Sequence, residues 1–139
     1  MTCLFCAILA GDVDAHFVFD ETLIAGFLDS RPVFKGHTLL VPRIHVDTIT
    51  ELPPDLYAPL FDAAARVTAA VRHALGAQGS FVAMNNTVSQ SVPHLHMHVV
   101  PRTKGDGLRG FFWPRTKYDD EADAADYAAR LRGAMTTTI

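Results

Sequence analysis

The sequence predicts an α+β fold, built on an antiparallel sheet of about five strands with one long central helix and shorter terminal helices. Strand patterns come in pairs, and the helical patterns do not alternate with them as they do in a parallel βαβ fold. The strand patterns combine β-branched and aromatic residues with flanking turn residues. They cover residues 17–19, 23–28, 37–41, 80–84 and 95–100.

The long helix is expected over residues 55–75, where apolar residues recur at helical spacing. Gly76 ends it, because glycine readily adopts the left-handed conformation found after a helix. Pro59 lies inside this stretch, so we expect the regular part to begin there. Shorter helices are expected at 3–10 and at about 121–135. The repeating apolar positions of the long helix are Leu56, Leu60, Ala64, Val67, Val71 and Leu75.

The composition indicates a globular protein without a nucleic-acid or membrane partner. The chain has 139 residues, 49% apolar and 19% charged, which suits a single domain over 1–139, including a C-terminal tail from about 103 to 139. Its net charge is −3, and no run of Lys or Arg forms a basic patch. The N-terminus has no secretory signal pattern, and no apolar run could span a membrane. We therefore expect a cytoplasmic protein.

The only two cysteines, Cys3 and Cys6, are separated by two residues. A disulfide between them would close a very small loop and restrict little of the unfolded chain. In a reducing compartment this spacing is typical either of half a metal site or of a redox pair. The spacing alone does not decide between these two interpretations.

Three histidines, His94, His96 and His98, alternate with apolar residues near the end of the sheet pattern. Alternate residues of a strand point to opposite faces, so the imidazoles share one face, about 6–7 Å apart along the strand. Imidazole is a nucleophile, a proton carrier and a metal ligand. The alternatives to a catalytic role are a chance cluster and a triad that only binds metal.

The segment from Gln90 to Pro101 resembles the histidine triad motif H-φ-H-φ-H-φ-φ of the HIT nucleotide-binding proteins, in which φ is apolar. Two more stretches, 27–32 and 35–45, are similar to the family's ribose-binding loop and the strand that follows it. Roughly residues 3–102 can be matched. The resemblance implies the HIT fold and a hydrolase similar to the bacterial Hint-like and Fhit-like branches.

The resemblance also implies a mechanism. The middle histidine, matching His96, attacks the α-phosphorus and forms a nucleotidyl-histidine intermediate, from which water releases a nucleoside monophosphate. This requires a neutral ring whose other nitrogen donates to a backbone carbonyl. By the same resemblance His98 holds a phosphate oxygen or the leaving group, and Ser91 bonds to the scissile region. Ser91 could instead be an ordinary strand-entry residue.

The nucleotide contacts implied by the resemblance come from five residues. Asp29 matches the carboxylate that accepts hydrogen bonds from the ribose hydroxyls, although it could instead cap a turn. Asn85 and Gln90 match polar positions that contact phosphate or help build the site. Phe27 and Ile8 are candidate walls for the base, while sequence alone favours a core position for Phe27.

His37 is expected to support the triad from a neighbouring strand, with a hydrogen-bonded core histidine as the alternative. Histidine at the third triad position, His98, indicates hydrolysis, because the nucleotidyltransferase branch typically has glutamine there. Many relatives have a glycine-rich stretch before the triad, whereas residues 86–89 contain no glycine. A tighter phosphate loop is therefore expected, which bears on the roles of Asn85 and Gln90.

The resemblance favours a metal site for the cysteine pair. Some HIT relatives carry zinc on four positions that match Cys3, Cys6, His45 and His94, and structural zinc takes four such nitrogen and sulfur ligands. We therefore expect structural Zn²⁺ here, which would fix His94 and steady the segment that presents His96. Two free thiols with two ordinary histidines, or a redox pair, are the alternatives.

Together these patterns predict a hydrolase of nucleoside phosphoramidates or related α-phosphate esters, with a purine nucleotide as substrate. A dinucleoside polyphosphate hydrolase is the alternative enzyme. A nucleotide-binding regulatory module with incidental activity is the alternative from another class. Family members are commonly homodimers, so we expect a homodimer. Residues 111–114 (FFWP) could serve either an interface or a leaving-group pocket.

Overall fold

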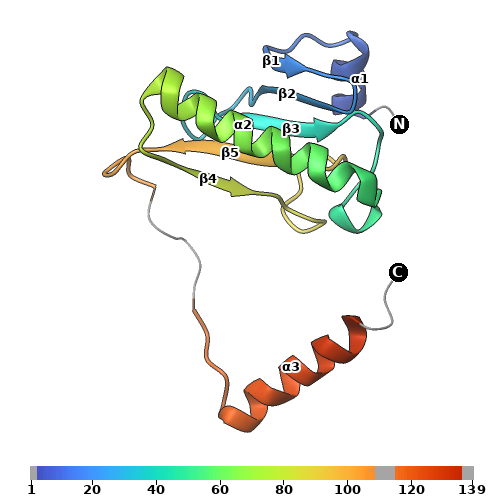
Figure 1. Ribbon diagram of the computed structural model, residues 1–139, viewed down its shortest axis with the longest axis vertical. Coiled ribbons are helices and arrows are strands. Elements are labelled where there is room, and N and C mark those ends of the chain that lie inside the picture. The colour runs from blue at the N-terminus through green and yellow to red at the C-terminus, as the bar shows by residue number, and fades with distance from the viewer. Residues whose placement is uncertain (1–2, 109–114, 136–139) are drawn as a thin grey trace. The chain divides into compact units, whose positions relative to one another are not determined.

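The computed structural model describes residues 3–108 and 115–135, and the Cα positions divide the chain into two compact units, 1–106 and 107–139. The first unit holds a five-stranded sheet in the order β1-β2-β3-β5-β4, and all neighbouring strands are antiparallel (Figure 1). The strands are β1 (Phe17–Asp20), β2 (Ile24–Leu28), β3 (Thr38–Pro42), β4 (Gly79–Ala83) and β5 (Met97–Arg102).

Two helices cover opposite faces of this sheet. The long helix α2 (Tyr57–Leu75) lies across one face (Figure 1), and its buried side chains pack on Ile24, Leu40 and Val99. The short helix α1 (Leu4–Ala10) lies on the other face. There its Phe5 and Ile8 side chains pack against the alternate strand residues Ala25, Phe27, Leu39 and Val41. Since alternate residues face opposite sides, β2 and β3 are apolar on both sides and are buried almost throughout.

Helix α1 places both thiols at its beginning. The Cys3 Sγ accepts a hydrogen bond from the Cys6 main-chain N at 3.4 Å, and Cys3 is the residue that caps the helix. Gly11 ends the helix with φ of 85°, and its N–H donates to the carbonyls of Ala7 and Ile8. The helix is therefore seven residues long, with its apolar side on the sheet.

The predicted α+β class is confirmed, including the five antiparallel strands and the long helix between two shorter ones. The strand predicted at 95–100 begins two residues later in the structure, where β5 spans Met97–Arg102. Its pairing with β3 begins at Leu40 opposite Met97. The next residues of β3 end in Pro42, which has no N–H to donate to a ladder. His94 and His96 consequently lie just before the strand, in irregular backbone that still runs beside the sheet.

The long helix begins earlier than Pro59 suggested. A 3₁₀ turn at Pro54–Leu56 leads into α2 at Tyr57, so Pro59 is its third residue. The N–H groups of the first turn have no partner inside the helix, so a proline is tolerated there. Another 3₁₀ turn spans Ile49–Glu51. In the second unit α3 (Glu121–Met135) has the predicted bounds.

Among the described residues, no helix is long and apolar enough to cross a membrane. The segment 111–114, to which we assigned an interface or a leaving-group pocket, lies outside the described residues. That assignment stays a prediction.

Candidate active site and metal centre

The triad histidines lie on the α1 side of the sheet and are covered rather than exposed to solvent. The exposed fraction is 0% for His94 and 3% for His96, and His98 is half-buried. The Phe5 ring of α1 meets His96 edge-on, with centroids 5.0 Å apart and an interplanar angle of 85°. On the opposite side of the same segment, Leu95 and Met97 join the core under α2, as the alternation predicted.

The protonation of His96 follows from its main-chain partner. The Nδ1 of His96 lies 2.8 Å from the carbonyl oxygen of His94. Because a carbonyl only accepts, Nδ1 carries a proton, and Nε2 is the nitrogen that has a free electron pair in the neutral tautomer. This is the donation to a backbone carbonyl that the sequence led us to expect. The hydrogen bond therefore selects the tautomer in which Nε2 is the nitrogen able to attack.

A hydrogen-bond relay fixes the protonation of His98. The main-chain N–H of Val33 donates to His37 Nδ1 at 3.1 Å, so that nitrogen is an acceptor and the His37 proton lies on Nε2. His37 Nε2 then donates to His98 Nδ1 at 2.9 Å. The remaining proton of His98 is on Nε2. The structure thus supports a role for His37 at the triad, and no described residue accepts a hydrogen bond from the remaining N–H of His98.

Burial keeps both relay histidines neutral. The pKa of His98 is lowered to about 4, mainly by desolvation and also by nearby His96 and His37, while Asp29 opposes the shift. Desolvation also lowers the pKa of His37, again against the attraction of Asp29. A second proton on either ring would have to point at an N–H group. This geometry also disfavours the charged rings, in agreement with the lowered pKa values.

Asp29 follows β2 and its two carboxylate oxygens have different surroundings. Oδ1 accepts a hydrogen bond from Arg31 N at 2.9 Å, so the turn-capping role that we considered is present. Oδ2 lies 3.7 Å from His37 Nε2, beyond hydrogen-bond length. One carboxylate oxygen of Asp29 is therefore still available to a ligand, as the predicted ribose contact requires.

Phe27 and Ile8, the predicted walls for the base, belong to the core cluster under α1. The exposed fraction is 2% for Phe27 and 7% for Ile8. Phe27 packs edge-on against Phe5 and Phe17, with centroids 5.3 and 5.8 Å apart. Their contact with a base stays a prediction, and their packing role is directly visible.

The polar residues before the triad form a tight loop. Asn85 Nδ2 donates to the Ser89 carbonyl at 3.1 Å, and Gln90 Oε1 accepts from Thr87 N at 2.8 Å. Thr87 and Ser89 in this loop have positive φ angles of 71° and 63°. The expectation of a tighter phosphate loop than in relatives stays a prediction. Asn85 and Gln90 shape it, and Ser91 follows it with its side chain exposed.

The structure brings together the four residues that we expected to bind zinc. The Sγ atoms of Cys3 and Cys6 each lie 3.5 Å from His94 Nδ1, and Cys6 Sγ lies 3.4 Å from His45 Nδ1. All four atoms are within 4.8 Å of one another. Two sulfurs and two imidazole nitrogens facing a common centre are a donor set that tetrahedral zinc prefers.

The hydrogen bonds of the two histidines in this cluster suit metal binding. His94 Nε2 donates to the Pro42 carbonyl at 2.8 Å, and His45 Nε2 donates to Asp47 Oδ1 at 2.9 Å. In the neutral form of each ring, Nδ1 is then the nitrogen with a free electron pair, and it faces the thiols. Burial lowers the pKa of His94, and burial together with Cys3 raises the pKa of the Cys6 thiol.

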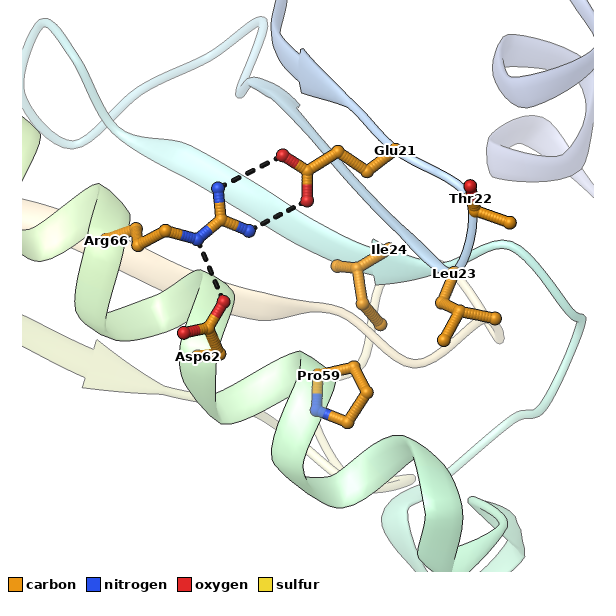
Figure 2. Close-up of a pocket in the computed structure, with 7 residues that line it drawn as sticks. All are labelled: Glu21, Thr22, Leu23, Ile24, Pro59, Asp62 and Arg66. Atoms are coloured by element: carbon orange, nitrogen blue, oxygen red, sulfur yellow. Dashed lines mark hydrogen bonds and ion pairs between the residues drawn. The ribbon is translucent and has the colours of Figure 1, made fainter.

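A surface hollow lies on the other side of the sheet. It has a volume of about 230 Å³ and is bordered by the β1–β2 turn and by α2 (Figure 2). Arg66 spans its polar side, bonding to Glu21 at 2.8 Å and to Asp62 at 2.9 Å. Since Ile24 and α2 belong to the core layer opposite α1, this hollow is separate from the histidines.

Sequence reasoning missed three participants in these clusters. Asp47 carries a visible signal, because a carboxylate two residues after a candidate ligand can reach back to it. Phe5 had a weaker signal, the apolar spacing of Phe5 and Ile8 on α1. Val33 acts through its main-chain N–H, which no side-chain pattern reveals.

Comparison with known families fits this arrangement. The model of the HIT domain matches residues 10–105. The chain belongs to the HIT family. It is 38% identical over 121 residues to Protein hit of Bacillus subtilis, covering 85% of this chain and 82% of that protein. It is 32% identical over 116 residues to the adenosine 5'-monophosphoramidase hnt1 of Schizosaccharomyces pombe, covering 82% and 84%.

Solved structures show the same fold. A HIT family protein from Bacillus subtilis aligns with a TM-score of 0.84 and 30% identity, over 96% of both chains. A zinc-bound histidine triad family protein from Mycobacterium smegmatis aligns with a TM-score of 0.74 and 36% identity, over 96% of this chain and 98% of that one. The HIT family resemblance inferred from the motifs is thereby confirmed.

Proposed function

We propose that this chain is a nucleotide hydrolase that attacks the α-phosphate of its substrate with His96 Nε2. A bond forms between Nε2 and phosphorus, and the bond from phosphorus to the leaving group breaks with its electron pair. Water then attacks phosphorus, the bond to His96 breaks, and a nucleoside monophosphate is released. Two smaller displacements replace one difficult step. The observation that carries this proposal is the His96 Nδ1–His94 carbonyl hydrogen bond, which makes Nε2 the nucleophilic nitrogen of the neutral tautomer.

His98 has a narrower role than a general acid in this proposal. Its Nε2–H donates a hydrogen bond to a phosphate oxygen or to the leaving atom. His98 does not transfer its Nε2 proton to the leaving group. The relay behind it ends at the main-chain amide of Val33, which cannot supply a replacement proton. A leaving amine therefore takes its proton from water. Preorganised donors of this kind stabilise charge that develops in the transition state.

The nucleotide would lie across the loop before the triad and the end of β2. Asp29 Oδ2 accepts from the ribose hydroxyls, and Ser91 donates to the scissile region. Asn85 and Gln90 set the shape of the phosphate loop, and Phe27 with Ile8 supports the base from beneath. Asp29 and Ser91 contribute contacts, whereas the four other residues contribute mainly shape.

We propose that Cys3, Cys6, His45 and His94 hold a structural Zn²⁺ ion. The donor set fits zinc, both imidazoles present Nδ1, and a zinc-bound relative shares the fold. The ion would supply crosslinking of α1 to the loop after β3 and to the triad segment. Because the His94 carbonyl accepts the hydrogen bond from His96 Nδ1–H, fixing His94 also steadies the His96 ring.

The leaving group that we favour is an amine. A relative with 32% identity is named adenosine 5'-monophosphoramidase, and His98 occupies the third triad position. The test is turnover of an adenosine phosphoramidate against a diadenosine polyphosphate, with AMP release measured for each. Preferential cleavage of the phosphoramidate supports the proposal, and preferential cleavage of the polyphosphate would replace it with the alternative enzyme. AMP binding without cleavage of either would leave only a nucleotide-binding module.

We also propose that the chain acts as a single HIT domain in a cytoplasmic homodimer. Strand β4 lies at one edge of the sheet, with Val82 exposed, and the neighbouring helix α2 exposes 74% of Phe61. Unpaired edges and large exposed apolar side chains commonly mark interfaces. Light scattering on the full chain tests this, since a dimer has twice the 15.2 kDa mass of the chain.

A further inference from the structure

The loop after β3 connects the metal centre to the nucleotide site. We call residues 45–49 the bridging segment, since it begins with the metal ligand His45 and makes three hydrogen bonds to residues 86–95. Gln90 Nε2 donates to the Asp47 carbonyl at 2.6 Å, and Ile49 N donates to Asn86 Oδ1 at 2.8 Å. The third bond, Leu95 N to the Val46 carbonyl at 2.8 Å, lies between His94 and His96.

Asp47 uses three of its groups in this segment. Its Oδ1 accepts from His45 Nε2 at 2.9 Å, so the carboxylate fixes the His45 tautomer that directs Nδ1 at the thiols. Its main-chain N donates to Glu51 Oε1 at 3.1 Å, which anchors it to the following 3₁₀ turn. Its carbonyl holds Gln90. One residue thus orients a metal ligand and restrains a residue of the phosphate loop.

The Gln90 side chain transmits this restraint into the loop. While Nε2 bonds to Asp47, Oε1 accepts from Thr87 N at 2.8 Å. Thr87 and Ser89 have left-handed backbone with φ of 71° and 63°. Non-glycine residues in that region cost on the order of 1–3 kcal/mol each, so surrounding contacts must hold them. The Gln90 side chain is one such contact, and its other end is tied to Asp47.

We propose that Asp47 is a positioning residue for both sites: it orients His45 toward the metal and, through Gln90, sets the phosphate loop, so that metal and nucleotide binding are coupled. The coupling rests on the proposed nucleotide and zinc sites. Because linkage is reciprocal, a nucleotide that needs the ordered loop also raises the affinity for the metal. A carboxylate that orients a ligating histidine typically contributes about 10–100-fold to metal affinity.

The first experiment titrates the chelator-stripped full chain with Co²⁺ and follows the absorption of thiolate-bound cobalt. Asp47→Ala should weaken binding about 10–100-fold, and Asp47→Asn, which keeps an acceptor oxygen, should restore much of it. Asp62→Ala is the matched control, because Asp62 is also an exposed carboxylate with one side-chain partner, Arg66. Equal affinity in Asp47→Ala, Asp62→Ala and the parent chain would overturn the orienting role.

The second experiment repeats the titration with saturating AMP. In the parent chain AMP should raise Co²⁺ affinity severalfold. In Gln90→Leu the Co²⁺ affinities with and without AMP should become equal, although Gln90 is no metal ligand. A parent chain whose Co²⁺ affinity ignores AMP would overturn the coupling. A chain that binds no Co²⁺ would overturn the metal site and this role of Asp47 together. A chain that binds Co²⁺ but not AMP would overturn the coupling and the proposed function, while the first experiment still decides the orienting role.

Discussion

Two clusters of this molecule place potential metal ligands equally close together, yet their hydrogen bonds differ. In one, Cys3, Cys6, His45 and His94 have donor atoms within 4.8 Å; in the other, Asp29, His37 and His98 do. In the first cluster each histidine uses Nε2–H to bond an outside oxygen, so Nδ1 faces the thiols. In the second, the close approach of the two histidines is itself a hydrogen bond.

The difference lies in what the main chain offers to each ring. The Pro42 carbonyl accepts a hydrogen bond from His94 Nε2–H, and this leaves Nδ1 as the nitrogen that can bind a metal. The Val33 amide donates to His37 and thereby makes Nδ1 an acceptor. The proton of His37 therefore lies on Nε2, the nitrogen that faces His98. A metal on His37 Nε2 would leave the ring without any proton. Proximity of ligand atoms is therefore insufficient, and the tautomer distinguishes a metal centre from a relay.

The largest expected effect separates the clusters by chemistry. His96→Ala should abolish turnover, with a loss of about 10³-fold or more, because the covalent step has no other nucleophile. Binding of AMP and of Co²⁺ should both persist, since neither cluster includes His96. Steady-state turnover with parallel calorimetry of AMP checks this. Turnover close to that of the parent chain would remove His96 from its role.

Removal of the metal should act on stability more than on chemistry. A ligand present at about 1,000 times its Kd stabilises a fold by about 4 kcal/mol, which corresponds to roughly 10 °C in Tm for a domain of this size. Cys6→Ser, or chelation of the parent chain, should produce this loss. Thermal melts with and without chelator measure it. An unchanged Tm in both cases would argue for free thiols.

Breaking the relay should affect activity without affecting the metal. His37→Leu leaves His98 Nδ1 without its donor, so the His98 tautomer is no longer fixed. Loss of about one hydrogen bond predicts roughly a tenfold decrease in kcat. His73→Leu, an exposed histidine of α2, is the matched control. If His37→Leu instead weakened Co²⁺ binding while kcat stayed constant, the two clusters would have been assigned the wrong way round.

The smallest effect is a pH dependence of stability. The pKa of His98 is lowered to about 4 by burial, so the folded chain resists a proton that the unfolded chain binds near 6.5. The unfolding free energy should therefore rise with pH between about 4 and 6.5 and level off above. For a half-buried side chain we expect about 1–2 kcal/mol. Denaturant melts at several pH values measure this. The unfolding free energy of His98→Gln should change less with pH than that of the parent chain, and an equal change in both would contradict the lowered pKa of His98.

The sequence predicted the elements of the fold because its periodicities are local. It also predicted which side chains gather at the candidate metal centre and the triad, because the motifs place them at known offsets. It could not predict the start of β5 at Met97, which depends on Pro42 in a neighbouring strand. The relay through Val33 and the tie from Asp47 to Gln90 were equally hidden, since main-chain groups brought together by folding make them.

The protonation states of the histidines test the account most directly. Long-range ¹H–¹⁵N correlation spectra of the ¹⁵N-labelled chain report which ring nitrogen of each histidine is protonated. We predict protonated Nδ1 for His96, protonated Nε2 for His37 and His98, and Zn²⁺-dependent shifts at Nδ1 of His45 and His94. A proton on His96 Nε2, or Zn²⁺ shifts centred on His37 and His98, would contradict the separation of a metal centre from a catalytic relay.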